Sequence, residues 1–271
     1  MLRGRDIQAI AGKAKIRDTQ IEKDYVLSWL LWGIAQSDLL YKNLIFKGGT
    51  VLKKAYFSDF RFSEDLDFTL INATLTDEQI IEAFRQILEL VGEESGMQFK
   101  ISEIDKHQSG SIAFYSYFVG PLGGKMDSKS VKIDITRGEK LLFKPVVCPI
   151  FKAYNDLPKE DFSLQCYPLE EVIVEKLVAL IGRTQPRDLY DIWYLLEENV
   201  VELNFLKSEF AEKARHKGHQ PDSFLATWQR KTKQFENLWN QYLAHQIADL
   251  PKFEGVCRAL NRHFKVFGKE R

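Results

Sequence analysis

The pattern of apolar residues changes once along the chain, and this change limits the folds that the sequence can adopt. Up to about residue 160, helical periodicity alternates with segments in which apolar and polar residues take turns, as they do in half-buried strands. From residue 161 to residue 271 the pattern is helical. We therefore expect an α+β domain at 1–160 and a helical domain at 161–271.

The first half should contain two long helices and several strands. An amphipathic helix is expected at 19–36, with Thr19 as its N-cap, and a second one at 77–94. A shorter helix should begin directly after Gly48 and Gly49. Alternation predicts strands at 61–71, 97–104, 111–120 and 130–136.

Composition favours a folded protein that stays out of the membrane. Hydrophobic residues make up 45% of the 271 residues, which is ample for a core. The richest apolar run, VLSWLLWGIA, is interrupted by Ser28 and Gly33, and the N-terminal segment does not resemble a signal peptide. We expect a cytoplasmic protein without a membrane partner.

Two aspartates lie in the strand expected at 61–71. Side chains alternate along a strand, so Asp65 and Asp67 should share one face while Leu66 and Phe68 enter the core. Neighbouring carboxylates repel each other unless a cation neutralises them, and a divalent ion with oxygen ligands suits such a pair. The alternative is a strand edge that faces water.

A third aspartate follows in SVKIDIT, the strand expected at 130–136. If this strand pairs with the one that carries Asp65 and Asp67, then Asp134 joins their face. Three carboxylates can hold two Mg²⁺ ions, which clamp the attacking and leaving oxygens in phosphoryl or nucleotidyl transfer. Alone, Asp134 would simply be a residue that faces solvent.

A glycine pair precedes these aspartates. Gly48 and Gly49 follow the apolar run at 44–47, and backbone N–H groups at a helix start can bind an anion. Thr50 would add a hydroxyl. The ending and spacing of a Walker A loop are missing, so a P-loop enzyme is disfavoured. A plain turn is the alternative.

Cations gather in two helices expected after residue 168. Lys176 and Arg183 are seven residues apart on one helix, and Arg187 and Asp188 open the next. These cations could hold a triphosphate tail. The alternatives are a surface face of ion pairs and, for Asp188, an interaction with the helix dipole.

Charge is unevenly distributed, although the whole chain is neutral. Residues 205–271 contain 13 Lys and Arg against 7 Asp and Glu, a net charge of +6 that the rest of the chain offsets. A basic helical region is typical of a surface that meets a polyanion such as RNA. An ordinary solvated helical surface remains the alternative.

Five segments together resemble a known family. In order, KGGT, RFSEDLDF, KIDIT, EVIVEKLVAL and PRDLYDIW resemble the AbiEii/AbiGii toxin family of nucleotidyltransferases, which includes the mycobacterial MenT toxins. The resemblance spans roughly 21–196 and implies a polymerase-beta-like nucleotidyltransferase core with a mixed sheet. Thr50 stands where the family usually has serine.

The resemblance also implies roles for individual residues. Asp65, Asp67 and Asp134 would bind Mg²⁺ or Mn²⁺, and Asp134 would help to activate the attacking hydroxyl. Gly48, Gly49 and Thr50 would bind the nucleotide phosphates. Lys176 and Asp188, which match the family's later motifs, would be catalytic. Lys47, Arg61 and Ser63, which flank the core motifs, would support nucleotide binding, and Arg183 would do so by its spacing from Lys176.

The implied activity is transfer of a nucleotide from a nucleoside triphosphate to an acceptor hydroxyl. Family members are typically toxins of toxin–antitoxin or abortive-infection systems, each with a cognate antitoxin, and some modify the 3′ end of tRNA. A small molecule or a protein could replace tRNA as acceptor. Two further alternatives are a catalytically inactive nucleotide-binding module and a metal-dependent hydrolase, although the histidine-rich ligands of many hydrolases are missing.

Overall fold

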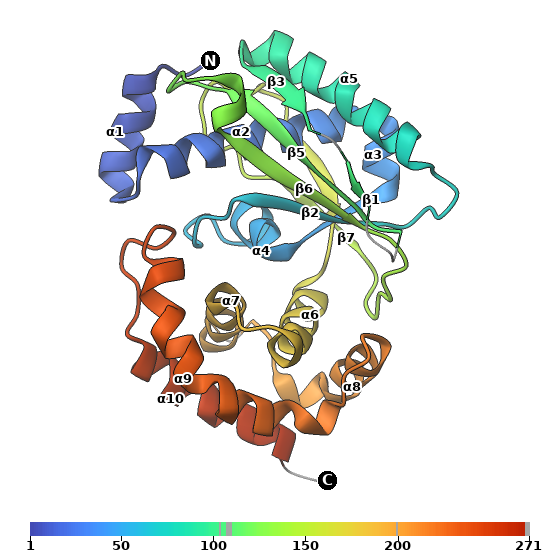
Figure 1. The fold of residues 1–271 in the computed structure, drawn as a ribbon, viewed down its shortest axis with the longest axis vertical. Helices are drawn as coiled ribbons and strands as arrows, with labels where there is room; N and C mark the ends of the chain where they lie inside the picture. Colours follow the sequence, from blue (N-terminus) through green and yellow to red (C-terminus); the bar gives the residue numbers. More distant parts are fainter. Residues whose placement is uncertain (103, 107–109, 199, 269–271) are drawn as a thin grey trace. The chain divides into compact units, whose positions relative to one another are not determined.

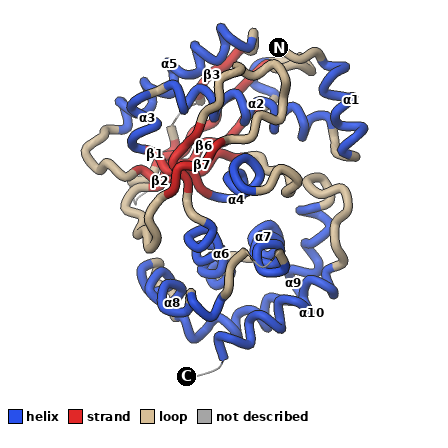
Figure 2. Tube along the Cα trace, turned by 180° about the vertical axis from the view of Figure 1, so that it is seen from behind, coloured by secondary structure: helices blue, strands red, loops and turns tan. Residues whose placement is uncertain are grey.

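The chain divides into two units that differ in secondary structure (Figure 1). The computed structural model describes residues 1–102, 104–106, 110–198 and 200–268. Unit 1 comprises Met1–Glu139 and Pro145–Cys166, and unit 2 comprises Lys140–Lys144 and Tyr167–Arg271. Every described strand belongs to unit 1, whereas unit 2 consists of helices and loops (Figure 2). The α+β class with C-terminal helices is confirmed.

Unit 1 is built on a mixed sheet of eight strands. Seven of them follow the order β3–β5–β6–β2–β1–β8–β7, and β4 also pairs with β5. The pairs β2–β6 and β1–β8 are parallel, and the others are antiparallel. The strands are β1 (Leu44–Lys47), β2 (Asp65–Leu70), β3 (Gln98–Ile101), β4 (Asp105–Lys106), β5 (Ile112–Val119), β6 (Ser130–Thr136), β7 (Val146–Pro149) and β8 (Ser163–Cys166).

The helices of unit 1 include one that is buried nearly all round. They are α1 (Gly4–Ala14), α2 (Asp18–Gln36), α3 (Asp38–Asn43), α4 (Gly48–Val51) and α5 (Asp77–Ser95). The helix expected at 19–36 is confirmed as α2. Thr19 is not its N-cap, because α2 starts one residue earlier, after Arg17, and α2 is not amphipathic, because it buries polar as well as apolar side chains. Among the described residues, no helix is long and apolar enough to cross a membrane.

The charges buried along α2 are matched by lysines from other elements of unit 1. Glu22 lies 2.7 Å from the Lys129 ammonium, and Asp24 lies 2.7 Å from that of Lys54. Tyr154 also donates a hydrogen bond of 2.8 Å to Asp24. These contacts offset much of the cost of burying the two carboxylates, although Oδ1 of Asp24 has no hydrogen-bond partner among the described residues.

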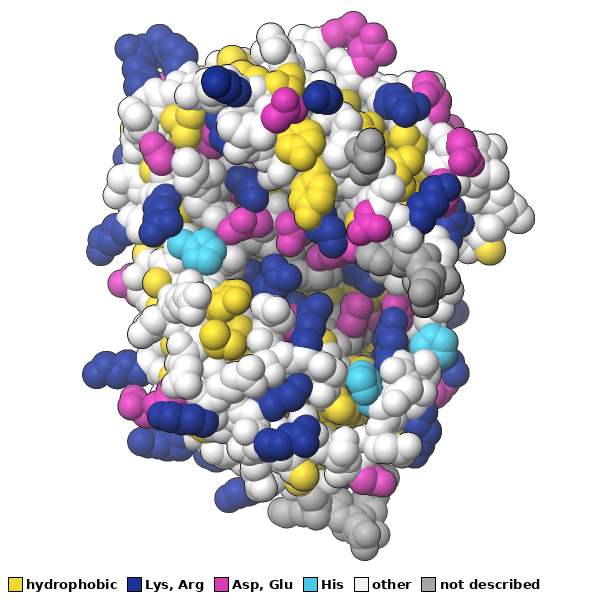
Figure 3. Space-filling model, viewed as in Figure 1, with side chains coloured by type: hydrophobic (Ala, Val, Ile, Leu, Met, Phe, Trp, Pro, Cys, Tyr) yellow, Lys and Arg dark blue, Asp and Glu magenta, His cyan; other side chains and the backbone are white. Residues whose placement is uncertain are grey.

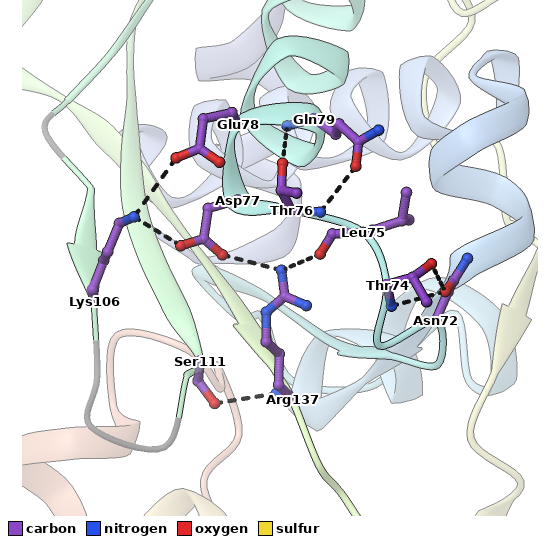
Figure 4. Close-up of polar contacts among 10 residues, drawn as sticks. All are labelled: Asn72, Thr74, Leu75, Thr76, Asp77, Glu78, Gln79, Lys106, Ser111 and Arg137. Carbon is purple, nitrogen blue, oxygen red and sulfur yellow. Dashed lines mark hydrogen bonds and ion pairs between the residues drawn. The ribbon is translucent and has the colours of Figure 1, made fainter.

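The start of α5 is fixed to the end of β6 by polar contacts (Figure 4). Arg137, directly after β6, donates from Nη2 to the Asp77 carboxylate at 3.0 Å and to the Leu75 carbonyl at 2.8 Å. Thr76 and Gln79 form a capping box at the same helix start. The helix that covers the buried face of the sheet is thereby held in register with the strand that carries Asp134.

Unit 2 packs its helices around aromatic side chains. Its long helices are α6 (Leu169–Gly182), α7 (Pro186–Glu197), α8 (Lys207–His216), α9 (Phe224–Leu243) and α10 (Phe253–Phe264). The ring of Phe224 lies 4.9 Å from that of Phe264 and 5.3 Å from that of Phe210. A buried ion pair of 2.7 Å joins Glu171 to Lys213, and Glu171 also accepts the N–H groups of Leu142 and Phe143. This explains why Lys140–Lys144 belongs to unit 2.

Candidate active site

Three aspartates lie on one face of the sheet because β2 and β6 are parallel neighbours. Asp67 is directly opposite Asp134, and Asp65 is opposite Lys132. All four side chains are half-buried, whereas Leu66, Phe68 and the alternate residues of β6 are buried on the other face. The predicted strand pairing is therefore confirmed. We call Asp65, Asp67, Asp134 and Lys132 the carboxylate face.

Lys132 is a member of this face that the sequence reasoning did not assign to the site. Its ammonium lies 3.0 Å from Oδ2 of Asp134. Burial would lower the pKa of Lys132, but Asp134, and at longer range Asp65 and Asp67, raise it. Lys132 therefore acts as a cation within the acidic cluster. The signal was available, because Lys132 and Asp134 alternate onto the same side of SVKIDIT.

Gly48 lies directly against the Asp67 carboxylate. Its φ of +82° is a conformation that favours glycine, and a Cβ atom at this position would overlap with Oδ2 of Asp67. The register explains the approach, since Lys47 is opposite Asp67 and Gly48 follows at once. The glycine pair and the aspartate pair thus meet, and Gly48 is required by both space and backbone conformation.

Thr50 has a different contact from the one expected of it. Its side chain is buried, and its hydroxyl donates a hydrogen bond of 2.5 Å to the backbone carbonyl of Asp65. The Thr50 hydroxyl thus ties α4 to the start of β2. The helix continues from α4 as a π-helical turn, Leu52–Tyr56. Such turns often occur at functional sites.

The other predicted nucleotide-binding residues of unit 1 are buried. The Lys47 ammonium is 3.9 Å from a Glu139 carboxylate oxygen. Arg61 donates to the Phe62 carbonyl at 3.1 Å, and the Ser63 carbonyl accepts from Gln20 at 3.4 Å. Lys47 thus borders the carboxylate face, while the contacts of Arg61 and Ser63 shape the segment that leads into β2.

Oxygen donors on the carboxylate face have the chemistry that Mg²⁺ or Mn²⁺ requires. Hard divalent ions prefer carboxylate oxygens, and Asp67 and Asp134 face each other across one strand pair. Among the described residues, however, no three His, Cys, Asp or Glu side chains already converge as metal ligands. Since the Lys132 ammonium contacts Asp134, an ion that used this oxygen would have to take the place of the ammonium.

A second group of charged side chains is formed within unit 2. Lys176 on α6 contacts Asp188 at 2.9 Å and Asp191 at 2.7 Å, both on α7. Arg183 donates two hydrogen bonds to Asp188, one of 2.7 Å from Nε and one of 3.1 Å from Nη2. We call Lys176, Arg183, Asp188 and Asp191 the buried ion cluster, in which only Arg183 is largely exposed, at 54% of its side chain.

Asp188 is ionised in this cluster despite its burial. Burial by itself would raise the pKa of Asp188, but Lys176 and Arg183 outweigh that effect and hold it well below the usual range. Asp191 was missed by the sequence reasoning. Its signal was its place three residues after Asp188, which puts both carboxylates on one side of α7.

The carboxylate face belongs to unit 1, and the buried ion cluster belongs to unit 2. Each predicted site residue is therefore located in the structure. Asp65, Asp67, Asp134, Gly48 and Lys47 form one group in unit 1. Lys176, Arg183 and Asp188 form another in unit 2.

Comparisons with solved structures agree with this fold. MenT4, a nucleotidyltransferase toxin of Mycobacterium tuberculosis H37Rv, matches with a TM-score of 0.65 and 16% identity over 100% of this chain and 91% of that one. JHP933 of Helicobacter pylori matches with a TM-score of 0.60 and 15% identity over 93% of both chains. A putative nucleotidyltransferase from H. pylori matches with a TM-score of 0.57 and 17% identity, over 93% of this chain and 96% of that one.

Sequence comparison supplies the family. No curated protein matches the chain. The sequence model described as "Nucleotidyl transferase AbiEii toxin, Type IV TA system" matches residues 29–262, which is most of the chain. The resemblance noted in the sequence is thereby confirmed. The protein belongs to the AbiEii family of nucleotidyltransferase toxins of type IV toxin–antitoxin systems.

Proposed function

We propose that the protein transfers a nucleoside monophosphate from a nucleoside triphosphate to an acceptor hydroxyl at the 3′ end of a tRNA. The observation that carries this proposal is the carboxylate face, where Asp67 and Asp134 are opposite each other and Gly48 lies against Asp67. A place for divalent ions next to a place for phosphates is what nucleotidyl transfer requires.

Asp65, Asp67 and Asp134 would hold Mg²⁺ or Mn²⁺. When bound, the ion supplies positive charge that stabilises the developing charge on the phosphate oxygens. The three carboxylates outnumber Lys132 on this face, so the site favours cations of higher charge. Lys132 would turn away from Asp134 as the ion enters.

Gly48 and Gly49 would receive the triphosphate at the start of α4. Without side chains, their backbone can approach an anion closely, and the N–H groups at a helix start are free of intrahelical partners. Since the Thr50 hydroxyl is donated to Asp65, we assign any phosphate contact of Thr50 to its backbone N–H. Lys47, which borders the face, would add positive charge.

The reaction would proceed by in-line displacement at the α-phosphorus. The acceptor hydroxyl forms the new bond to phosphorus, the bond to the bridging oxygen breaks, and pyrophosphate leaves. Asp134, which lies on the β6 side of the face, would accept the proton of the attacking hydroxyl. Positioning and charge neutralisation would supply most of the rate enhancement.

Lys176, Arg183 and Asp188 of the buried ion cluster would serve the same reaction, as the family resemblance and the charges of unit 2 suggest. Asp188 fixes the orientation of Lys176 and Arg183, and the exposed part of Arg183 offers donors suited to a phosphate. Its role would be to meet the triphosphate tail. An Arg183→Ala variant should raise the KM for nucleoside triphosphate more than it lowers kcat, and an unchanged KM would remove Arg183 from the site.

Positive charge in residues 205–271 supports RNA as the acceptor. Among this region's cations, Arg230, Arg258 and Lys265 are exposed. Phosphate neutralisation makes RNA binding steeply dependent on salt. If tRNA binding is indifferent to salt, a small molecule or a protein becomes the better acceptor. Membership of a type IV system implies an antitoxin partner, and the identity of that partner is open to genetic tests.

The decisive test is transfer of label. The protein is incubated with each α-labelled nucleoside triphosphate, Mg²⁺ and total tRNA, and the labelled polymer is identified on a denaturing gel. We expect label on the tRNA with the wild type and a loss with Asp65→Asn. Full transfer by Asp65→Asn would refute the mechanism, and label on protein or a small molecule would reassign the acceptor.

A further inference from the structure

The sheet face that carries the three aspartates continues onto β5, where it presents two tyrosines. Along β5 the side chains alternate, with Ile112, Phe114 and Phe118 buried on the opposite face. Tyr115 and Tyr117 therefore point to the same side of the sheet as the carboxylate face. The proposed function does not use either residue.

The register places these tyrosines next to the site. Tyr115 is directly opposite Lys132, and Lys132 is directly opposite Asp65. Tyr115 is thus two strands from Asp65, a distance of about 10 Å for ordinary strand spacing. Tyr117 is opposite Ser130 on one side and Lys100 on the other. The result is a continuous strip of aromatic and cationic side chains that leads away from the aspartates.

Exposure distinguishes Tyr115 from the aromatic residues of the core. Its relative exposure is 44%, and Tyr117 is half-buried. In the space-filling view, which has the orientation of Figure 1, side chains of the hydrophobic class lie exposed over the region of β5 and β6, with Lys or Arg beside them (Figure 3). An aromatic ring on a charged, open sheet face is available to a ligand.

We propose that Tyr115 and Tyr117 form a stacking platform for the unpaired bases at the end of a single-stranded acceptor RNA. This inference rests on the proposed function, because it deepens the assignment of the acceptor. Aromatic side chains on an open sheet stack bases without regard to their sequence, and nearby lysines attract the phosphates. Lys132 and Lys100 occupy those positions beside the two rings.

The order of strands indicates that the platform meets the bases of the acceptor RNA and not the base of the incoming nucleotide. The glycines proposed to bind the triphosphate follow β1, on one side of Asp67, whereas β6 and β5 lie on the other side. The incoming nucleotide therefore enters from the β1 side, and the acceptor approaches across β5. Tyr115 lies beyond Asp134 and Lys132 on this path, where the last bases of the acceptor would be.

Binding of a labelled oligonucleotide tests the platform without turnover. The probe is a short fluorescein-labelled single-stranded oligoadenylate, measured by anisotropy at low salt with the full-length protein. Tyr115→Val and Tyr117→Val keep good strand formers but remove the rings. Each should weaken binding about 5- to 150-fold, the range for loss of one base–aromatic stack. Tyr115→Phe should bind within about twofold of the wild type, because it keeps the ring.

A matched control uses a tyrosine elsewhere. Tyr41 on α3 is half-buried like Tyr117 and lies outside both the carboxylate face and the basic region, so Tyr41→Ala should leave binding unchanged. If Tyr41→Ala weakens binding as much as Tyr115→Val, or if the wild type does not bind the oligonucleotide, the proposal is overturned. Equal binding by wild type and both valine variants also overturns it.

A base on the platform could come from the acceptor RNA or from the incoming nucleotide. Calorimetric measurement of nucleoside triphosphate binding distinguishes the two. If Tyr115→Val weakens triphosphate binding and leaves oligoadenylate binding intact, the platform serves the incoming nucleotide and the acceptor assignment is wrong. Failure of the proposed function is a separate result. It would appear as absent label transfer by the wild type, whereas failure of the platform would appear as unchanged anisotropy in a protein that still transfers label.

Discussion

The two charge clusters of the protein differ in how their charges are balanced. On the carboxylate face, three aspartates share a half-exposed surface with Lys132. In the buried ion cluster, two carboxylates meet two cations at 2.7–3.1 Å. The first arrangement has room for an added cation, and the second neutralises itself. Removing a carboxylate from the face should therefore lower transfer without destabilising the fold, whereas removing the buried Asp188 from the cluster should destabilise the fold.

The largest effect is expected for Asp67→Asn. The change removes one carboxylate from beside Asp134, so transfer should fall by about a hundred- to a thousand-fold or more. Unfolding of the metal-free protein should be unchanged or shifted to higher temperature, because repulsion is relieved. Label transfer and calorimetric melting measure the two quantities. A variant that melts much earlier than the wild type would show that the carboxylate is structural.

A large loss of stability is expected for Asp188→Asn. Removing one partner from a buried ion pair leaves the other charges uncompensated and should cost about 3–5 kcal/mol of unfolding free energy. Urea denaturation measures this loss. Asp222→Asn is the control, because Asp222 is an exposed residue of the same unit, and its effect should stay within about 0.5 kcal/mol. Equal effects in the two variants would contradict the contrast between buried and surface charges.

The dependence of stability on acidic pH should also depend on the buried ion cluster. The pKa of Asp188 is held below its usual range in the folded protein, so its ionisation stabilises the fold above the unfolded pKa, about 3.9. This contribution is lost as the pH falls from about 5 towards the lower folded pKa. Unfolding free energy measured against pH should decline less steeply in Asp188→Asn than in the wild type. Parallel curves would assign the acid sensitivity to other groups.

Gly48→Ala should reduce both the stability of the fold and the transfer activity of the carboxylate face. The positive φ costs about 1–2 kcal/mol for a residue with a Cβ. The added atom must also displace Asp67, so transfer should fall as well. Gly96→Ala is the matched control, since Gly96 has φ +73° and no atom close to the position of its Cβ. It should lose similar stability and keep its activity. Lost activity in both variants would break the link to Asp67.

Lys132→Met should have the smallest effect. Without this cation the three aspartates attract a divalent ion more strongly, so the Kd for Mg²⁺ should fall. Solvent screens the charges of this half-exposed site, so the decrease should be about tenfold at most. Isothermal titration calorimetry measures the change. A higher Kd in Lys132→Met would mean that the lysine helps to keep the aspartates in the conformation that binds the ion.

Part of the carboxylate face could be predicted from the sequence. Alternation in RFSEDLDFTLI and SVKIDIT was enough to place Asp65, Asp67 and Asp134 on polar strand faces, and the glycine pair could be found from its place before a helix. These features depend on local periodicity. The parallel pairing of β2 with β6 is non-local, so it could be stated only as a condition until the structure showed it.

Other features depend on contacts that no local pattern records. The Thr50 hydroxyl is donated to a carbonyl fifteen residues away, so its direction could not be read from the motif. The helix α2 looked amphipathic, yet Lys129 and Lys54 from distant segments allow its Glu22 and Asp24 to be buried. β7 and β8 have four residues each, too few for alternation to be convincing.

Metal binding measured directly is the sharpest test of the central contrast. Mn²⁺ is titrated into the wild type, Asp67→Asn and Asp188→Asn, and the free ion is followed by its electron paramagnetic resonance signal. The account predicts binding by the wild type, a loss with Asp67→Asn, and retention by Asp188→Asn under conditions where that variant is folded. Equal Mn²⁺ binding by the wild type and Asp67→Asn would contradict the claim that the carboxylate face is the metal site.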